Sequence, residues 1–204
     1  MDFSYLLAAG VFVLGYVFGS IPNGLWLVKA LHHIDIRQYG SGNIGATNVF
    51  RTVGPKTAAI VLIGDMLKGI VPLYIADHCI GAGAALVAIT ALGALLGHNY
   101  SLFLGFKGGK GVATGLGLFL YMLPVSAGVG FVVWAVLVAI TRYVSLGSIV
   151  AAVVAAGSAW YFAYPWPYAA FGTLAALFVV IRHKDNIKRL ANGTESKIKP
   201  GHMK

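Results

Sequence analysis

Apolar runs long enough to cross a bilayer follow one another along this chain, from about residue 5 to about residue 181. A transmembrane helix needs about 20 mostly apolar residues, because each residue adds ~1.5 Å toward a ~30 Å hydrocarbon core. Only 10% of the 204 residues are charged, and the mean hydropathy is +0.81. This composition excludes an ordinary soluble domain. The sequence therefore predicts a single all-α integral membrane domain over residues 1–204.

The number of spans follows from Pro124 and the positive charges. Residues 111–141 are apolar throughout, and one helix over them would be about 47 Å long, too long for the core. A turn at Pro124 gives seven spans, and 14 of the 15 Lys and Arg residues then lie on one side. That side is cytoplasmic by the positive-inside rule, so the N-terminus is outside and the tail 182–204 is cytoplasmic. The predicted spans are approximately 5–28, 57–76, 80–97, 111–123, 124–141, 146–164 and 168–181.

The net charge of +9 narrows the choice of partners. The basic residues lie between apolar spans and do not form a separate basic domain, which favours membrane lipid and anionic ligands over nucleic acid. The single cysteine, Cys79, excludes an internal disulfide. Residues 1–28 lack Lys and Arg, so no cleavable signal peptide is predicted.

Residues 105–115 carry the strongest chemical signal. Glycine lets backbone N–H groups approach a ligand, and Lys107 and Lys110 add mobile positive charges. Helix-forming residues resume at Val112, so free N–H groups of a helix start are expected there, an arrangement that suits a phosphate. This stretch is not a Walker loop, because a Walker loop has Ser or Thr directly after its lysine, whereas Gly111 follows Lys110 here. The alternative is a flexible basic loop that touches lipid head groups.

Residues 40–51 (GSGNIGATNVFR) form a second polar, glycine-rich segment on the predicted cytoplasmic side. Arg51 offers a planar fork for a phosphate or carboxylate. Glycines such as Gly45 bring the backbone close to a ligand. The candidate side chains here are Ser41, Asn43, Thr47, Asn48 and Arg51. In the alternative interpretation, Thr47 or Asn48 only caps a short helix that runs through Arg51.

The start of the tail, residues 183–190, has the pattern of a short amphipathic helix at the membrane surface. His183 and Asn186 are three residues apart and share one face of that helix. His183 can accept a proton or orient a hydroxyl; alternatively it only reaches toward the interface like its neighbours.

Other polar residues have open interpretations. His98 and Asn99 directly precede the lysine stretch and are expected to cap or brace it. Asp65 and Lys68 lie on one helical face inside a span, where a charge pair is costly unless it faces protein. They either form a structural ion pair or belong to the site.

Several kinds of catalytic site are absent from the sequence. The six acidic residues are scattered and no Cys/His cluster occurs, so no metal and no cofactor is predicted. The chain lacks Gly-x-Ser-x-Gly and the His-x-x-x-x-Asp pattern of many lipid acyltransferases. An acyl transfer here would proceed without that His–Asp pair.

Four stretches resemble the bacterial PlsY family of membrane acyltransferases. They are residues 40–51, 105–114 (GFKGGKGVAT), 142–148 (RYVSLGS) and 183–190 (HKDNIKRL), and the resemblance extends to 64–69 (GDMLKG) and nearly the whole chain. It implies seven membrane helices in the bacterial cytoplasmic membrane and an active site on the cytoplasmic side. It further implies transfer of an acyl group from long-chain acyl phosphate to the 1-hydroxyl of sn-glycerol 3-phosphate, with no obligatory protein partner. Lysophosphatidic acid and inorganic phosphate would be the products.

The resemblance also implies roles for individual residues. Ser41, Arg51 and Lys110 would hold the phosphate of glycerol 3-phosphate, while His183 and Asn186 would hold its hydroxyls. Lys110, His183 and Asn186 would form the catalytic set. The pocket around the acyl phosphate would comprise Asn43, Gly45, Thr47, Asn48, Lys107, Gly108, Gly109, Gly111, Thr114 and Ser145.

Proteins of other classes share parts of this pattern. A phosphate or organophosphate transporter would also be basic, multi-spanning and glycine-rich, but broken helices near the bilayer midplane and repeated halves are not visible here. A nucleotide-dependent lipid kinase would need Mg²⁺-binding carboxylates near the lysines, and the sequence has none there. A purely structural membrane protein does not explain why the polar glycine motifs gather on one side.

Overall fold

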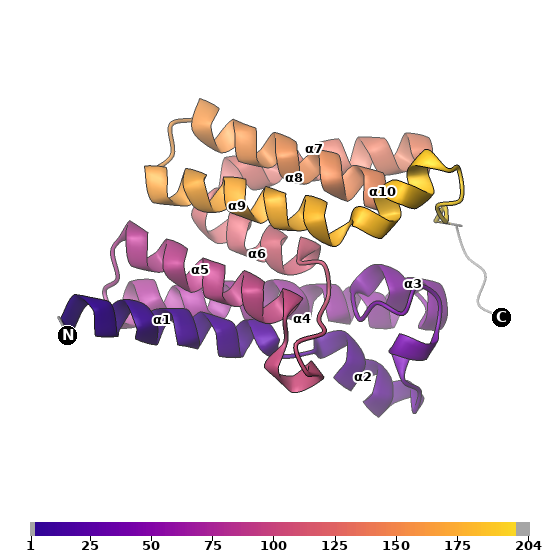
Figure 1. The fold of residues 1–204 in the computed structure, drawn as a ribbon, viewed down its shortest axis with the longest axis horizontal. Helices are drawn as coiled ribbons and strands as arrows, with labels where there is room; N and C mark the ends of the chain where they lie inside the picture. The colour runs from indigo at the N-terminus through magenta and orange to yellow at the C-terminus, as the bar shows by residue number, and fades with distance from the viewer. Residues whose placement is uncertain (1–2, 199–204) are drawn as a thin grey trace.

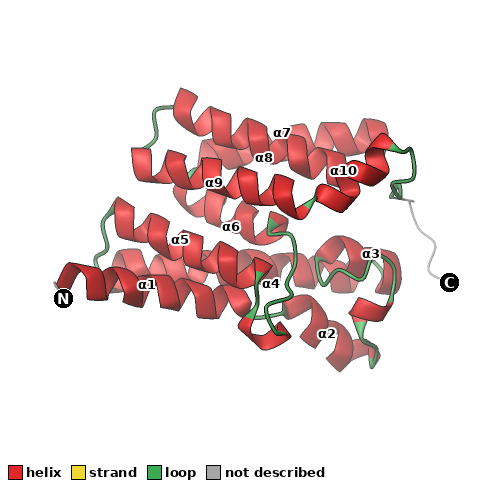
Figure 2. Ribbon diagram, viewed as in Figure 1, coloured by secondary structure: helices red, strands yellow, loops and turns green. Residues whose placement is uncertain are grey.

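The structure is a computed structural model, and it describes residues 3–198. Ten α-helices and no strand occur in that part of the chain (Figure 2). The α-helices are α1 Phe3–Ser20, α2 Asn23–His32, α3 Ala46–Val53, α4 Pro55–Tyr74, α5 Ala84–Asn99, α6 Val112–Met122, α7 Pro124–Thr141, α8 Val144–Tyr161, α9 Trp166–Arg182 and α10 Lys184–Ala191. The predicted tail reaches residue 204, and its part beyond residue 198 lies outside the described residues.

The helices form two layers that α6 joins (Figure 1). One layer contains α1, α4 and α5, and the other contains α7, α8 and α9. Helix α6 lies between them and contacts α4 and α5 on one side and α7 and α9 on the other. The short polar helices α2, α3 and α10 all lie at the end of the molecule opposite the N-terminus (Figure 1). The glycine-rich segments of the sequence are therefore gathered at one end of the bundle.

Two prolines divide the apolar runs. Leu123 has non-helical backbone angles (φ −137°, ψ 54°) because the residue before a proline is pushed out of the α region, so residues 111–141 form two helices. Pro22 interrupts the first predicted span, 5–28. The chain there forms two helices, α1 and α2, with Ile21 and Pro22 between them. Helix α5 starts at Ala84, later than the predicted residue 80, because a π-helical turn, Ile75–Cys79, ends the preceding helix.

Five helical stretches are long and apolar enough to cross a membrane. They are Ser4–His32, Pro55–Cys79, Ala84–Leu104, Pro124–Thr141 and Val144–Tyr161. Helices α6 and α9 are apolar but shorter, so the seven-span topology stays a prediction.

Close packing of α1 against α5 depends on glycine. A Cβ atom at Gly19 would lie 2.0 Å from the carbonyl oxygen of Ala94, and one at Gly97 would lie 2.2 Å from that of Tyr16. Small residues let helix backbones approach in lipid, where van der Waals packing drives association. The packing of α1 against α5 thus fixes the end of α5. The loop of residues 100–111, which contains Lys107 and Lys110 and is called the lysine loop below, starts there.

Asp65 and Lys68 form a buried ion pair at the break between α1 and α2. Their side chains are 3.0 Å apart, and Lys68 Nζ donates to the carbonyl of Ile21 at 2.7 Å. Asn23 Nδ2 donates to Asp65 Oδ1 at 3.1 Å. The pair thus adds a donor to a backbone carbonyl in the non-helical turn between α1 and α2, and both buried charges face protein. Asp65 also borders the cavity described next.

Candidate functional site

A cavity of about 1210 Å³ opens where the polar segments meet. All the candidate site residues except Gly109 and Thr114 line it. They come from the loop before α3, from α3, from the lysine loop before α6, from α8 and from α10 with the residue before it. The fold thus brings together residues that lie up to 145 positions apart, as the contact of Arg51 with Ser196 shows.

The cavity is strongly positive at its polar end. Seven Lys and Arg residues line it against three acidic residues: Arg37, Arg51, Lys107, Lys110, Arg182, Lys184 and Arg189, against Asp65, Asp185 and Glu195. An excess of positive charge in a concave, partly dry site favours an anionic ligand.

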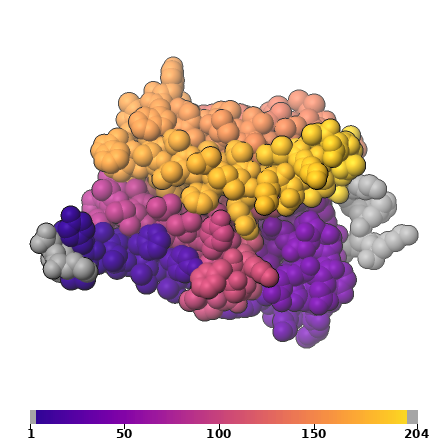
Figure 3. All heavy atoms as spheres, in the orientation of Figure 1, coloured from indigo at the N-terminus to yellow at the C-terminus, as the bar shows by residue number. Residues whose placement is uncertain are grey.

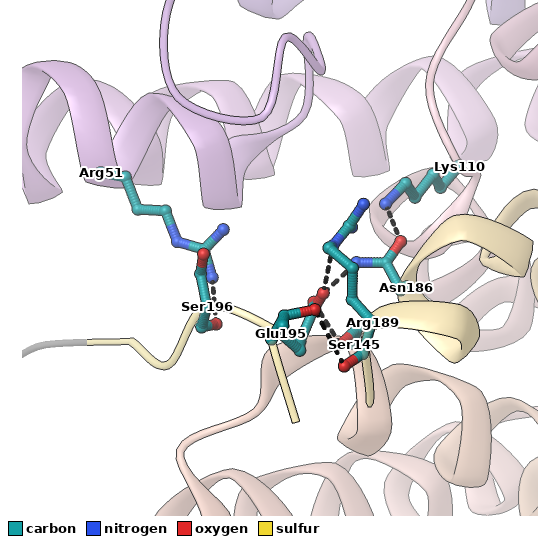
Figure 4. Close-up of polar contacts among 8 residues, drawn as sticks. Arg51, Lys110, Ser145, Asn186, Arg189, Glu195 and Ser196 are labelled. Atoms are coloured by element: carbon teal, nitrogen blue, oxygen red, sulfur yellow. Dashed lines mark hydrogen bonds and ion pairs between the residues drawn. The ribbon is translucent and has the colours of Figure 1, made fainter. Parts of the chain in front are cut away.

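Lys110 and Asn186 meet across the cavity mouth. Lys110 Nζ donates to Asn186 Oδ1, and Asn186 Nδ2 in turn donates to Glu195 Oε1 at 2.7 Å (Figure 4). Burial, and next the neighbouring Arg189, lower the pKa of Lys110. An anion arriving beside Lys110 reverses this effect, because an opposite charge favours the protonated amine.

Glu195 is the central acceptor of this network, although the acidic residues are scattered in the sequence and Glu195 was not predicted to belong to the site. Its carboxylate accepts from Ser145 Oγ and Arg189 Nε at 2.7 Å each, besides Asn186 (Figure 4). Burial alone would raise the pKa of Glu195, but the hydrogen bonds from Ser145, Asn186 and Arg189 outweigh it and lower this pKa. The only sequence signal was that Glu195 is one of two acidic residues in the basic tail 182–204.

Arg51 faces the cavity with unused donors. Nη2 donates to the carbonyl of Ser196 at 3.0 Å, whereas its buried Nε has no hydrogen-bond partner among the described residues. Burial lowers the pKa of the Arg51 guanidinium. The negative charge of Glu195 acts in the opposite direction, and the positive charge of Arg189 lowers this pKa further. A buried N–H without a partner is costly, so this geometry favours a ligand oxygen beside Arg51.

Asn48 holds the loop before α3 and does not cap the helix. Its Nδ2 donates to the carbonyls of Ile36, Tyr39 and Asn43, and its Oδ1 accepts from the N–H of Ser41 at 2.8 Å. The helix instead begins after Gly45, which has no side chain to cap it. The capping interpretation of Thr47 or Asn48 is therefore wrong. Asn48 uses its polar atoms inside the protein and positions Ser41 at the cavity wall.

The two glycines 108 and 109 pack against the end of α5. Their N–H groups donate to the carbonyls of Asn99 and His98 at 3.1 and 3.0 Å. A Cβ at Gly108 would lie 2.0 Å from the carbonyl oxygen of His98. These N–H groups are thus not free for a ligand, and His98 and Asn99 brace the loop as expected.

The free N–H groups lie a few residues later. Helix α6 begins at Val112, as the sequence predicts, after Gly111 in the left-handed conformation (φ 79°). The first helical hydrogen bond runs from Gly115 N to Gly111 O, which leaves the N–H groups of the first turn without a backbone partner among the described residues. Such a helix start binds anions. Thr114 Oγ1 lies 3.1 Å from His98 Nδ1 and anchors this turn from behind.

His183 is buried at the junction of α9 and α10. Its Nδ1 lies 2.8 Å from the carbonyl oxygen of Val179. Because a carbonyl only accepts, Nδ1 carries the hydrogen and a neutral ring presents Nε2 as an acceptor. Burial, with smaller effects of Lys110 and Arg182, lowers the pKa of His183 to about 4 against the opposing effects of the Val179 bond and Glu195. His183 is therefore neutral at pH 7.

An apolar arm continues the cavity away from the charges. It passes between α6, α7, α8 and α9, and small residues on α8 and α9 leave the room for it. The residues that line this arm include Leu116, Phe119, Phe131, Trp134, Ala151, Ala155, Ala175 and Val179. The site thus combines an anionic-ligand end with a hydrocarbon-binding end.

Known proteins share this fold and sequence. The family model described as glycerol-3-phosphate acyltransferase matches residues 9–193. A glycerol-3-phosphate acyltransferase of Syntrophomonas wolfei is 44% identical over 93% of this chain and 96% of its own length, and one of Geobacter sulfurreducens is 48% identical over 90% and 94%.

Two crystal structures of PlsY (YgiH), an integral membrane glycerol 3-phosphate acyltransferase, superpose on this chain. The glycerol 3-phosphate form has a TM-score of 0.88 at 38% identity and covers 94% of this chain and 96% of the crystallised one. The lysophosphatidic acid form has a TM-score of 0.87 at 37% identity, with 94% and 95% covered.

Proposed function

We propose a function for this chain from its family: it belongs to the glycerol-3-phosphate acyltransferases. It acylates the 1-hydroxyl of sn-glycerol 3-phosphate, and the acyl donor is a long-chain acyl phosphate. Lysophosphatidic acid and inorganic phosphate are the products. The observation that carries this proposal is the cavity, in which a strongly cationic end continues into an apolar arm. Two substrates that each carry a phosphate, one of them with a hydrocarbon chain, match that shape and charge.

The acceptor binds at the polar end in this proposal. Arg51 and Lys110 approach the cavity from two different elements and supply charge-assisted hydrogen bonds to the phosphate, with Ser41 beside them. His183 Nε2 accepts a hydrogen bond from one glycerol hydroxyl, and Asn186 holds the glycerol hydroxyls together with it. The two PlsY crystal structures are a glycerol 3-phosphate form and a lysophosphatidic acid form, which supports this acceptor and product.

The donor binds along α6. The N–H groups of the first turn of α6, together with Lys107, bind the phosphate of acyl phosphate, and Gly111 permits the close approach. The acyl chain extends into the apolar arm between α6 and α9. This arrangement places the acyl carbonyl at the junction of the two parts of the cavity.

The chemistry needs little from the protein beyond orientation and charge. The acceptor oxygen attacks the acyl carbon, the new ester C–O bond forms, and the bond from that carbon to the phosphate oxygen breaks. The hydroxyl proton passes to a substrate phosphate oxygen, and inorganic phosphate leaves. Because acyl phosphate is already activated, positioning and electrostatic stabilisation supply the rate without a dedicated side-chain base.

The test is an acyl-transfer assay on the purified full chain in lipid, without added metal. Glycerol 3-phosphate is supplied with palmitoyl phosphate, palmitoyl-CoA or acetyl phosphate, and lysophosphatidic acid and phosphate are measured. We expect product from palmitoyl phosphate, none from palmitoyl-CoA, and little acylated product from acetyl phosphate, which cannot fill the apolar arm. Binding of glycerol 3-phosphate without any product would contradict the proposal and direct the next experiment to uptake in vesicles.

His183 is expected to position a hydroxyl and not to act as the base. A base of pKa about 4 is weak at pH 7, so His183→Gln should lower kcat by less than about 10³-fold. The measurement is the steady-state kcat of the wild type, His183→Gln and His183→Ala at saturating glycerol 3-phosphate. Losses above about 10³-fold in both variants would show that His183 acts as the catalytic base.

We further propose that the chain crosses the bacterial cytoplasmic membrane seven times, with the site on the cytoplasmic side. Support comes from the positive-inside rule and from the position of α2, α3 and α10 at one end of the bundle. The only cysteine, Cys79, is exposed between α4 and α5, on the predicted outer side. An impermeant maleimide should label it in right-side-out vesicles. Lys56→Cys in a Cys79→Ser background should react only after permeabilisation, and the reverse pattern would contradict this orientation.

A further inference from the structure

Arg182, the last residue of α9, holds the backbone of the lysine loop. Its Nε donates to the carbonyl of Gly109 at 3.1 Å, and its Nη2 donates to the carbonyl of Gly108 at 3.0 Å. The guanidinium lies over the ring of Tyr100, 5.4 Å from its centre. Two parallel donors on a planar fork define both the position and the orientation of the peptides that they bind.

The Gly108–Gly109 segment is thereby held from two sides. On one side its N–H groups donate to the carbonyls of Asn99 and His98. On the other side its two carbonyls accept from Arg182. Lys110 is the next residue, and its side chain reaches Asn186. The clamp therefore fixes the backbone from which the Lys110 ammonium approaches the anion end of the cavity.

Arg182 forms no charge pair with the described residues. No carboxylate lies within ion-pair distance of its guanidinium among the described residues. Its hydrogen bonds go to neutral carbonyls that only this segment supplies. Lysine cannot reproduce the arrangement, because an ammonium is a point charge and lacks the planar pair of donors.

We propose that Arg182 is a positioning residue that acts through Lys110: by clamping the carbonyls of Gly108 and Gly109 it holds the Lys110 amine where it binds the phosphate of glycerol 3-phosphate. This inference rests on the proposed acyl transfer. In this inference Arg182, at the end of α9, contributes to the anion site without touching the ligand, because it holds the backbone that precedes Lys110. The position directly before His183 also links the hydroxyl-binding and phosphate-binding parts of the site.

The experiment is a double-mutant cycle on the full chain in lipid, with kcat, KM for glycerol 3-phosphate and its Kd measured separately. Arg182→Lys is expected to raise KM and Kd by about 10- to 100-fold and to change kcat much less. In a Lys110→Ala background, the same substitution should change kcat/KM and Kd by less than about threefold, because the group that it positions is gone. Arg142→Lys, at an exposed arginine after α7, is the matched control and should behave like the wild type.

A second readout separates positioning from general destabilisation. Ethylguanidine, at concentrations that leave the wild-type rate unchanged, should restore part of the affinity of Arg182→Ala for glycerol 3-phosphate and should not affect Lys110→Ala. Equal losses in both backgrounds would overturn the inference by showing that Arg182 acts independently of Lys110, and so would an unchanged KM in Arg182→Lys. A wild-type chain without activity toward acyl phosphate would instead refute the proposed function, so the two failures are distinguishable.

Discussion

Replacing Lys110 with alanine is expected to lower kcat/KM for glycerol 3-phosphate by about 10³-fold, the upper range for loss of one donor that stabilises developing charge in a desolvated site. Lys110 is half-buried at the cavity mouth and bonds only to the neutral Asn186 Oδ1 in the described structure. Its charge is therefore available to a substrate phosphate. Removing it also leaves Arg51 alone to bind that phosphate from the opposite wall.

The measurement is the steady-state rate of lysophosphatidic acid formation from palmitoyl phosphate, together with the affinity for glycerol 3-phosphate. Lys188→Ala is the matched control, since Lys188 is exposed on α10 and does not line the cavity. Lys110→Ala should lower both the rate of lysophosphatidic acid formation and the affinity for glycerol 3-phosphate, whereas Lys188→Ala should match the wild type in both. A Lys110→Ala enzyme with unchanged affinity would contradict the assignment of Lys110 to the acceptor phosphate.

Replacing Glu195 with alanine is expected to remove nearly all activity and to destabilise the tail end of the fold by about 2 kcal/mol, within the range for leaving buried hydrogen-bond donors without an acceptor. The change leaves the donors of Ser145, Asn186 and Arg189 without their shared acceptor. Asn186 then loses the orientation that lets it accept from Lys110. Rate and thermal unfolding in detergent are measured, with Asp185→Asn, an exposed acid on α10, as the control for stability.

The same carboxylate gives a pH dependence with a defined sign. Because the folded-state pKa of Glu195 is lowered from its ordinary value of 4.5, its contribution to stability is fully present above pH 4.5. That contribution is lost as the pH falls through the folded-state pKa. The difference in unfolding midpoint between the wild type and Glu195→Gln should therefore be constant from neutral pH to about pH 5 and shrink below pH 4.5. A difference that disappears already near pH 6 would contradict the described network.

Local patterns were enough to predict much of this site. The glycines and lysines of residues 105–111 predicted a basic loop followed by the start of a helix, and α6 begins at the expected Val112. Pro124 predicted the separation of α6 from α7, because the constraint of a proline on its preceding residue is local. The three-residue spacing of His183 and Asn186 predicted that their side chains lie close together, and both line the cavity.

The missed features depend on contacts between distant segments. Glu195 had no neighbour in sequence that could mark it, and its partner Ser145 is 50 positions away. Arg182 was predicted only to be the first residue of the cytoplasmic tail, whereas its partners lie 73 and 74 residues earlier. For Gly108 and Gly109 the residue type was informative but the reason was different: they permit contact with α5, and the free N–H groups lie after them. A sequence pattern records that a backbone must approach something closely, and it does not say what.

The tail that supplies Glu195 has a consequence for biosynthesis. Residues 192–198 follow every apolar helix in the chain, and Glu195 among them closes the network that joins α8, α10 and the start of α6 (Figure 4). In the space-filling view the yellow C-terminal part of the described chain lies at the surface, directly above the purple N-terminal part (Figure 3). During translation these residues leave the ribosome after all the apolar helices have been made. The network that orients Asn186 toward Lys110 can therefore form only after every apolar helix has been made.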